Sequence, residues 1–178
     1  MFANDNKTFQ EDAEKRKDSL GKVERLLKVI KSGMLTTINS EDELCSRPMM
    51  LQKFDAETGE VWFFTGKNTG KVFDIQRDSH VNIAFASPGA SSFVSVNGAA
   101  SIVDDANLKK DLWSPFLLAW FPEGLKDPNL TLLCVKVSSV EYWDSSSTFV
   151  QIAGFAKAVL TGEKYKLSKS EHDHIDLI

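Results

Sequence analysis

An aromatic, apolar run passes directly into a loop of glycine and lysine in the segment Val61-Trp62-Phe63-Phe64-Thr65-Gly66-Lys67-Asn68-Thr69-Gly70-Lys71. Aromatic and β-branched residues favour strands, whereas a threonine such as Thr69 is a typical residue at the start of a helix. The apolar segment 44–54, which carries Arg47, is predicted to form the preceding strand. The predicted order is therefore strand, strand, helix start.

These elements offer the groups that bind phosphate. Arg47 can donate two parallel hydrogen bonds to a phosphate, Lys71 is a point charge, and Thr65 and Thr69 supply hydroxyls. The N-terminus of a helix adds free backbone N–H groups. The same residues also suit a plain β-hairpin with a polar turn and a helix cap at Thr69. Residue types alone leave both alternatives open.

The rest of the chain predicts a mainly β protein of the α+β type. Apolar positions recur with helical spacing from Phe9 to Ile30, and again between Asp104 and Asp127, where Pro115 separates two short helices. Further strands are expected at 34–38, 61–65, 81–86, 92–103, 130–143 and 149–158. Consecutive short strands with tight turns favour an antiparallel closed or split β-barrel with peripheral helices.

The domain organisation follows from length and composition. With 178 residues, of which 42% are hydrophobic and 26% charged, the chain is predicted to form a single domain over residues 1–178. We expect flexible tails at about residues 1–15 and 163–178. Gly98, inside a long strand, suits a bulge or a sharp bend.

The charge of the chain restricts its partners. A net charge of −4 argues against nucleic acid or an anionic membrane as the main partner, since either would need a surplus of Lys and Arg. No segment approaches the roughly 18 apolar residues that a membrane helix requires, and the N-terminus is highly charged. The expected location is cytoplasmic.

Cysteine and histidine give little indication of a metal site or a nucleophile. Cys45 and Cys134 both lie in apolar strands without a C-x-x-C spacing, so free thiols are expected. His172 and His174 lie in a polar terminal string, from which we predict no metal site. The chain contains no G-x-S-x-G motif, and Gly66-x-x-x-Gly70-Lys71 departs from the P-loop pattern.

Together the motifs resemble the FMN-binding split barrels related to pyridoxamine 5′-phosphate oxidase, in particular their general stress protein branch. The resemblance extends from the first helix to Trp143. It rests on the segments Ser46-Arg47-Pro48-Met49-Met50, Val61-Trp62-Phe63-Phe64-Thr65, Thr69-Gly70-Lys71, Val94-Ser95-Val96-Asn97-Gly98-Ala99-Ala100, Leu112-Trp113-Ser114-Pro115, Ala119-Trp120-Phe121-Pro122-Glu123-Gly124 and Glu141-Tyr142-Trp143-Asp144.

The resemblance implies a homodimer with a flavin in a groove at the subunit interface. The expected flavin is FMN, with FAD as the alternative. Arg47 and Lys71 would hold the phosphate, with Thr69 at the helix start. Further contacts would come from Phe64 and Thr65, from the backbone of Pro48, Met49 and Met50 along the isoalloxazine ring, and from Trp143. Thr37 or another side chain would lie near the flavin N5, and no catalytic acid or base is assigned.

Departures from the oxidases lower the expected positive charge. Gln52 replaces a lysine, Gly70 replaces an arginine, Phe93 replaces a glutamine, and no Arg-x-His segment follows Trp143. We therefore expect an FMN-dependent oxidoreductase of unknown small-molecule substrate that lacks pyridoxamine phosphate oxidase activity. Two alternatives stay open, namely a protein that binds or buffers flavin without turnover and a barrel that has lost its ligand.

The aromatic cluster of residues 113–121 also leaves two roles open. Trp113, Phe116, Trp120 and Phe121 lie on the predicted helical segment. Large aromatic side chains fill cores and interfaces, and they also cover flat cofactors. Packing in the core or at a dimer interface is the preferred interpretation.

Overall fold

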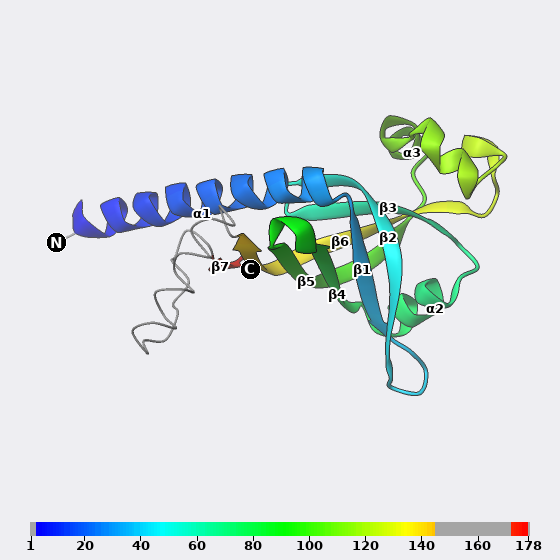
Figure 1. The fold of residues 1–178 in the computed structure, drawn as a ribbon, viewed down its shortest axis with the longest axis horizontal. Helices are drawn as coiled ribbons and strands as arrows, with labels where there is room; N and C mark the ends of the chain where they lie inside the picture. Colours follow the sequence, from blue (N-terminus) through cyan, green and yellow to red (C-terminus); the bar gives the residue numbers. More distant parts are fainter. Residues whose placement is uncertain (1–2, 145–171, 178) are drawn as a thin grey trace.

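The protein is described by a computed structural model that covers residues 3–144 and 172–177 (Figure 1). Its helices are α1 (Ala3–Ile30), α2 (Gly70–Arg77) and α3 (Ala106–Leu112), with 3₁₀ turns η1 (Pro88–Ala90), η2 (Pro115–Ala119) and η3 (Gly124–Lys126). Its strands are β1 (Ser32–Ile38), β2 (Leu44–Asp55), β3 (Glu60–Gly66), β4 (His80–Ser87), β5 (Ser92–Val103), β6 (Leu130–Asp144) and β7 (His172–Asp176).

The strands form one antiparallel sheet in the order β3-β2-β1-β4-β5-β6-β7. An additional pairing of β3 with the first half of β6, from Glu60 opposite Lys136 to Gly66 opposite Leu130, closes strands β1–β6 into a six-stranded barrel. The prediction of a mainly β, antiparallel barrel with peripheral helices is confirmed. Pro115 begins η2 and so separates the predicted helical segments.

Two apolar clusters explain why strand β3 is buried on both faces. The inner cluster fills the barrel and includes Phe63, Phe85 and Leu133. The outer cluster lies between β3, β6 and the segment from α3 to η2, and its buried members are Trp62, Phe64, Leu117, Leu130, Leu132 and Cys134. A strand buried on both faces is expected to be a continuous apolar run, as Val61–Phe64 is.

The predicted bulge at Gly98 is confirmed. The register between β5 and β6 shifts between Asn97 and Gly98. A Cβ atom at Gly98 would lie 2.3 Å from the Lys136 carbonyl oxygen, so the two backbones approach more closely than any other residue allows.

Both segments expected to be tails contain regular secondary structure among the described residues. Helix α1 begins at Ala3, and its first half extends beyond the barrel (Figure 1). At the other end, β7 pairs with Ser139–Trp143 of β6 and buries Ile175. The physical reason is that β3 pairs with β6 only up to Lys136, so that β7 covers an edge that would otherwise be unpaired. The predicted strand at 149–158 lies outside the described residues.

Within residues 3–144 and 172–177, no helix combines the length and apolarity that crossing a membrane requires.

Candidate functional site

A pocket of about 540 Å³ opens between strands β2 and β3, the start of α2, and η2. This size is typical of sites for small molecules. All the predicted site residues except Trp143 line the pocket, and they are Arg47, Pro48, Met49, Met50, Phe64, Thr65, Thr69 and Lys71. The remaining lining residues are Ser32, Gln52, Gly66, Leu117, Trp120, Phe121 and Asn129.

Arg47 is held in place by a polar network. Its guanidinium donates to the Thr37 hydroxyl, to the Cys45 carbonyl oxygen at 2.9 Å and to the Asp74 carboxylate at 3.2 Å. Thr37 in turn donates to Asp74 at 2.7 Å. Thr37 does not belong to the pocket lining, so its role in this structure is to orient Arg47. Asp74 neutralises the charge of Arg47.

Lys71 has no comparable counter-ion. Its ammonium donates to the Thr69 hydroxyl at 3.2 Å, and no carboxylate of the described residues lies within 4.0 Å of it. Burial, and after it the nearby charge of Arg47, lowers the pKa of Lys71 below its ordinary value. An anion in the pocket would remove the destabilisation of the charged lysine.

Two further features near Lys71 favour an anionic ligand. The Thr65 hydroxyl is buried, and among the described residues it finds no hydrogen-bond partner. Thr69 precedes α2, but its hydroxyl donates to the Gly66 carbonyl oxygen at 3.0 Å instead of capping the helix. The first N–H groups of a helix have no partner inside it, so the start of α2 offers free donors. A Cβ atom added at Gly70 would meet open space.

Asn129 fixes the loop between β3 and α2. Its backbone carbonyl oxygen accepts the Lys67 N–H at 2.7 Å, and its side chain accepts the Asn68 N–H at 3.0 Å. A Cβ atom at Gly66 would lie only 2.7 Å from the Asn129 amide nitrogen. Sequence reasoning missed Asn129 because an asparagine before a strand is typical of any turn. It likewise gave no signal for Asp74, whose role depends on the partner that the fold supplies.

The aromatic residues of segment 113–121 have two different roles, packing in the core and lining the pocket. Trp113 packs edge-on against Phe64, with ring centroids 5.6 Å apart, and so belongs to the outer core. Trp120 and Phe121 line the pocket, and Trp120 is 58% exposed. The pocket therefore joins a cationic, hydrogen-bonding end to an apolar wall that suits a flat ring system.

Trp143 is not brought to this pocket within one chain. Trp143 lies near the end of the 15-residue strand β6. The pocket lies at the opposite end of this strand, beside Asn129. Its ring stacks on His172, with centroids 5.2 Å apart, and His172 contacts Glu141 at 2.8 Å. His174 contacts Asp176 at 3.0 Å.

Both cysteines are free thiols, as expected. Burial raises the pKa of the Cys134 thiol to about 11. The described part of the chain contains no group of three or more His, Cys, Asp or Glu side chains that could hold a metal ion.

Comparisons with known proteins agree with this fold and pocket. A family model of pyridoxamine 5′-phosphate oxidase-like proteins matches residues 18–166. Protein bli-3 of Neurospora crassa is 32% identical over 149 residues, which are 78% of this chain and 71% of that protein. General stress protein 26 of Bacillus subtilis is 34% identical over 79 residues, which are 43% of this chain and 56% of that protein.

A solved structure gives a similar result. The general stress FMN/FAD binding protein of Xanthomonas citri is 31% identical and superposes with a TM-score of 0.63, over 71% of this chain and 89% of that one. The chain therefore belongs to the pyridoxamine 5′-phosphate oxidase-like family, in its general stress protein branch.

Proposed function

We propose that this protein binds FMN in the pocket between β2, β3 and α2. The single observation that carries the proposal is the half-buried Lys71, which has no carboxylate partner among the described residues and lies in the same pocket as the unsatisfied Thr65 hydroxyl. A phosphate monoester would supply the missing negative charge and the missing hydrogen-bond acceptors. The similarity to the general stress FMN/FAD binding protein of Xanthomonas citri supports a flavin.

The flavin ring would lie at the apolar end of the pocket. Pro48, Met49 and Met50 come from β2, and Trp120 lies on the opposite wall. These residues would bind and orient the ring and exclude water from one side of it. When bound, FMN supplies the capacity to accept and donate electrons. We propose that the protein uses it as a flavin-dependent oxidoreductase without pyridoxamine phosphate oxidase activity.

A second candidate function is flavin binding or buffering without turnover. It is favoured by the composition of the pocket, whose only titratable lining residues in the described part of the chain are Arg47 and Lys71. A guanidinium group offers hydrogen-bond donors and no acceptor. The pocket therefore presents neither a carboxylate nor a histidine that could act as a proton acceptor for a substrate.

We further propose that the protein is a homodimer with the flavin at its interface. The outer face of β1, β4 and β5 is uncharged and partly apolar, with Met34 and Phe93 each about 40% exposed. The face runs from Pro48, beside the pocket, through Met34 and Ala84, and Phe93 pairs with Trp143 on the next strand. Packing of this face against a second copy could bring the partner's Trp143 toward the pocket. The cytoplasmic location stays a prediction.

The proposal is tested by titrating the purified protein with FMN, FAD and riboflavin while following flavin fluorescence. We expect FMN to bind at least tenfold more tightly than riboflavin, because only FMN carries the phosphate. Equal affinities would contradict the phosphate site. NADH and NADPH oxidation in the same sample then separates the candidate functions, since turnover supports the oxidoreductase and binding without turnover supports the carrier.

A further inference from the structure

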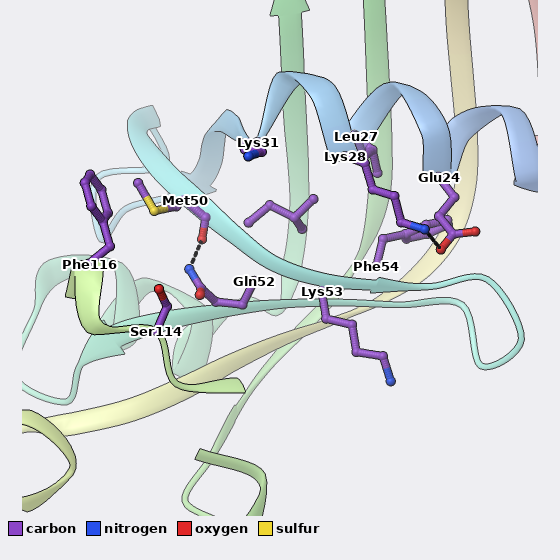
Figure 2. A pocket seen from close by; sticks show the side chains of 11 residues that line it. Glu24, Leu27, Lys28, Lys31, Met50, Gln52, Lys53, Phe54, Ser114 and Phe116 are labelled. Carbon is purple, nitrogen blue, oxygen red and sulfur yellow. Dashed lines mark hydrogen bonds and ion pairs between the residues drawn. The ribbon is translucent and has the colours of Figure 1, made fainter. Parts of the chain in front are cut away.

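A second cavity of about 700 Å³ adjoins the proposed flavin pocket (Figure 2). Its walls come from the last turns of α1, from residues 50–54 of β2 and from the segment around η2. Met50 and Gln52 line both cavities, so that the two spaces share a wall. The proposed flavin site makes no use of the part that lies under α1.

The floor of this cavity is apolar. Leu27 and Phe54 are buried in the barrel core, with 0% and 7% exposure, and Leu51 packs against the same core. Phe116 projects from η2 and is 63% exposed. In Figure 2, Phe116 and Met50 lie at the same end of the cavity. An aromatic ring beside a thioether and aliphatic side chains suits a flat, apolar ligand.

A β-bulge places an amide between the two cavities. The register of β2 and β3 shifts between Leu51 and Lys53, so Gln52 is the extra residue. Bulges change the direction of a side chain and often occur beside binding sites. The Gln52 side chain donates to the Met50 carbonyl oxygen at 3.0 Å, which fixes the amide on the shared wall. No donor among the described residues binds the Gln52 side-chain oxygen, which can therefore accept a hydrogen bond from a ligand.

The charged lining residues give the cavity a positive character. They are three lysines and one glutamate. Lys28 pairs with Glu24 at 2.7 Å, and Lys53 pairs with Asp55 at 2.8 Å. Lys31 is different, because no carboxylate of residues 14–144 or 172–177 with described side chains lies within 4.0 Å of its ammonium. One cation of the lining is thus left for an anionic ligand.

Lys31 also has an unusual backbone conformation. Its φ angle is 61°, in the left-handed region, and its N–H donates to the Leu27 carbonyl oxygen at 3.0 Å to end helix α1. Glycine is the usual residue at such a position, because a side chain there is strained. Strained backbone positions occupied by residues other than glycine cluster at active sites and ligand-binding sites.

We propose that this cavity binds a flat, apolar small molecule with one anionic group, a carboxylate or a phosphate. The body would lie over Met50 and Leu51 and against Phe116, and the anion would contact Lys31. The proposal rests on the proposed function only in naming the flavin as the neighbour across Met50 and Gln52. It identifies a place where a reaction partner of the flavin could be held.

The experiment is calorimetric titration of the full chain, saturated with FMN, with 1-naphthoate, 1-naphthyl phosphate and the neutral 1-naphthamide. We expect at least one anionic probe to bind about tenfold or more tightly than the amide, and Lys31→Met to abolish this preference. Lys110→Met, which removes an exposed lysine of α3, should keep it. Lys31→Gly should also abolish the preference while leaving the melting temperature unchanged or higher, because glycine relieves the strain.

Several outcomes separate this inference from the proposed function. Binding of FMN without binding of either naphthyl anion, or an anion preference that persists in Lys31→Met, would overturn the second site and leave the flavin site intact. Naphthoate binding that depends on Lys31 in a protein that does not bind FMN would support the second site and overturn the flavin site. A lower melting temperature for Lys31→Gly would contradict the account of Lys31 strain on which the inference depends.

Discussion

Arg47 and Lys71 lie in the same pocket, but the surrounding structure treats their charges differently. Arg47 is on strand β2 and donates to Asp74, whose side chain is only 13% exposed. Lys71 is on the first turn of α2 and donates to a neutral hydroxyl. A charge that already has a buried counter-ion contributes mainly to the folded state, whereas an uncompensated one contributes mainly to ligand binding. Two cations of one predicted phosphate site can therefore have separate functions.

The largest expected effect is that of Lys71→Met on FMN binding. Removing a charged hydrogen bond should cost about 1.5 to 3 kcal/mol, which weakens the affinity for FMN about 10- to 100-fold. Riboflavin, which has no phosphate, serves as the matched ligand, and its affinity should not change. The stability of the ligand-free variant should equal or exceed that of the wild type, since a half-buried charge is removed. An equal loss for FMN and riboflavin would show that Lys71 does not contact the phosphate.

Arg47→Met should instead reduce the stability of the ligand-free protein. It leaves the buried Asp74 carboxylate with only the Thr37 hydroxyl as a hydrogen-bond donor among its described partners. We expect a loss of about 1 to 2 kcal/mol in the free energy of unfolding, measured by urea denaturation. Arg47→Met combined with Asp74→Asn should recover most of that loss, because the unpaired charge is gone. If the losses in the free energy of unfolding of the two single variants simply add in the double variant, Arg47 and Asp74 are not coupled.

How far the sequence predicts this site depends on the range of the interactions. Val61–Thr65 and the helix start at Thr69 follow each other in the chain, so local pattern was sufficient to place them together. Arg47 joins them because β2 pairs with β3 as the next strand. The partner of Arg47 could not be predicted, since nothing local distinguishes Asp74 from other acidic residues on helices.

The parts of the fold that the sequence did not predict depend on long-range pairing. The strand β7 carries a single apolar residue, Ile175, and it forms only because the second half of β6 leaves an edge unpaired. A polar string of this kind gives no local strand signal. Trp143 was assigned to the flavin site by family resemblance, and within one chain it stacks on His172 instead. A role for Trp143 at the pocket therefore depends on the proposed homodimer.

Thr65→Val should have a smaller effect on the affinity for FMN. The Thr65 hydroxyl is buried without a partner among the described residues, so its removal should leave the ligand-free protein equally or more stable. If the hydroxyl binds the phosphate, FMN affinity should fall by about 0.5 to 1.5 kcal/mol while riboflavin affinity stays constant. Thr131→Val is the matched control, because that buried hydroxyl donates to the Val103 carbonyl oxygen at 3.1 Å. The control should lose stability and keep its FMN affinity.

The smallest effect is a pH dependence that only Lys71 should produce. In the ligand-free protein the pKa of Lys71 is lowered from 10.5, mainly by burial, so the unfolded chain binds more protons than the folded one between the two values. The contribution of Lys71 to the free energy of unfolding therefore rises with pH through this window.

A phosphate contact has the opposite effect on Lys71, because the bound anion stabilises the charged form of the lysine. The affinity for FMN should then fall as the pH rises through the lowered pKa, and this fall should be absent in Lys71→Met. Ionisation of the flavin ring affects FMN and riboflavin alike, so the ratio of their dissociation constants isolates the lysine. A ratio that is constant with pH in the wild type would mean that the charge of Lys71 is not used for the phosphate. Arg47→Met should keep a pH dependence of the ratio but move it to higher pH, because the charge of Arg47 contributes to the lowered pKa of Lys71.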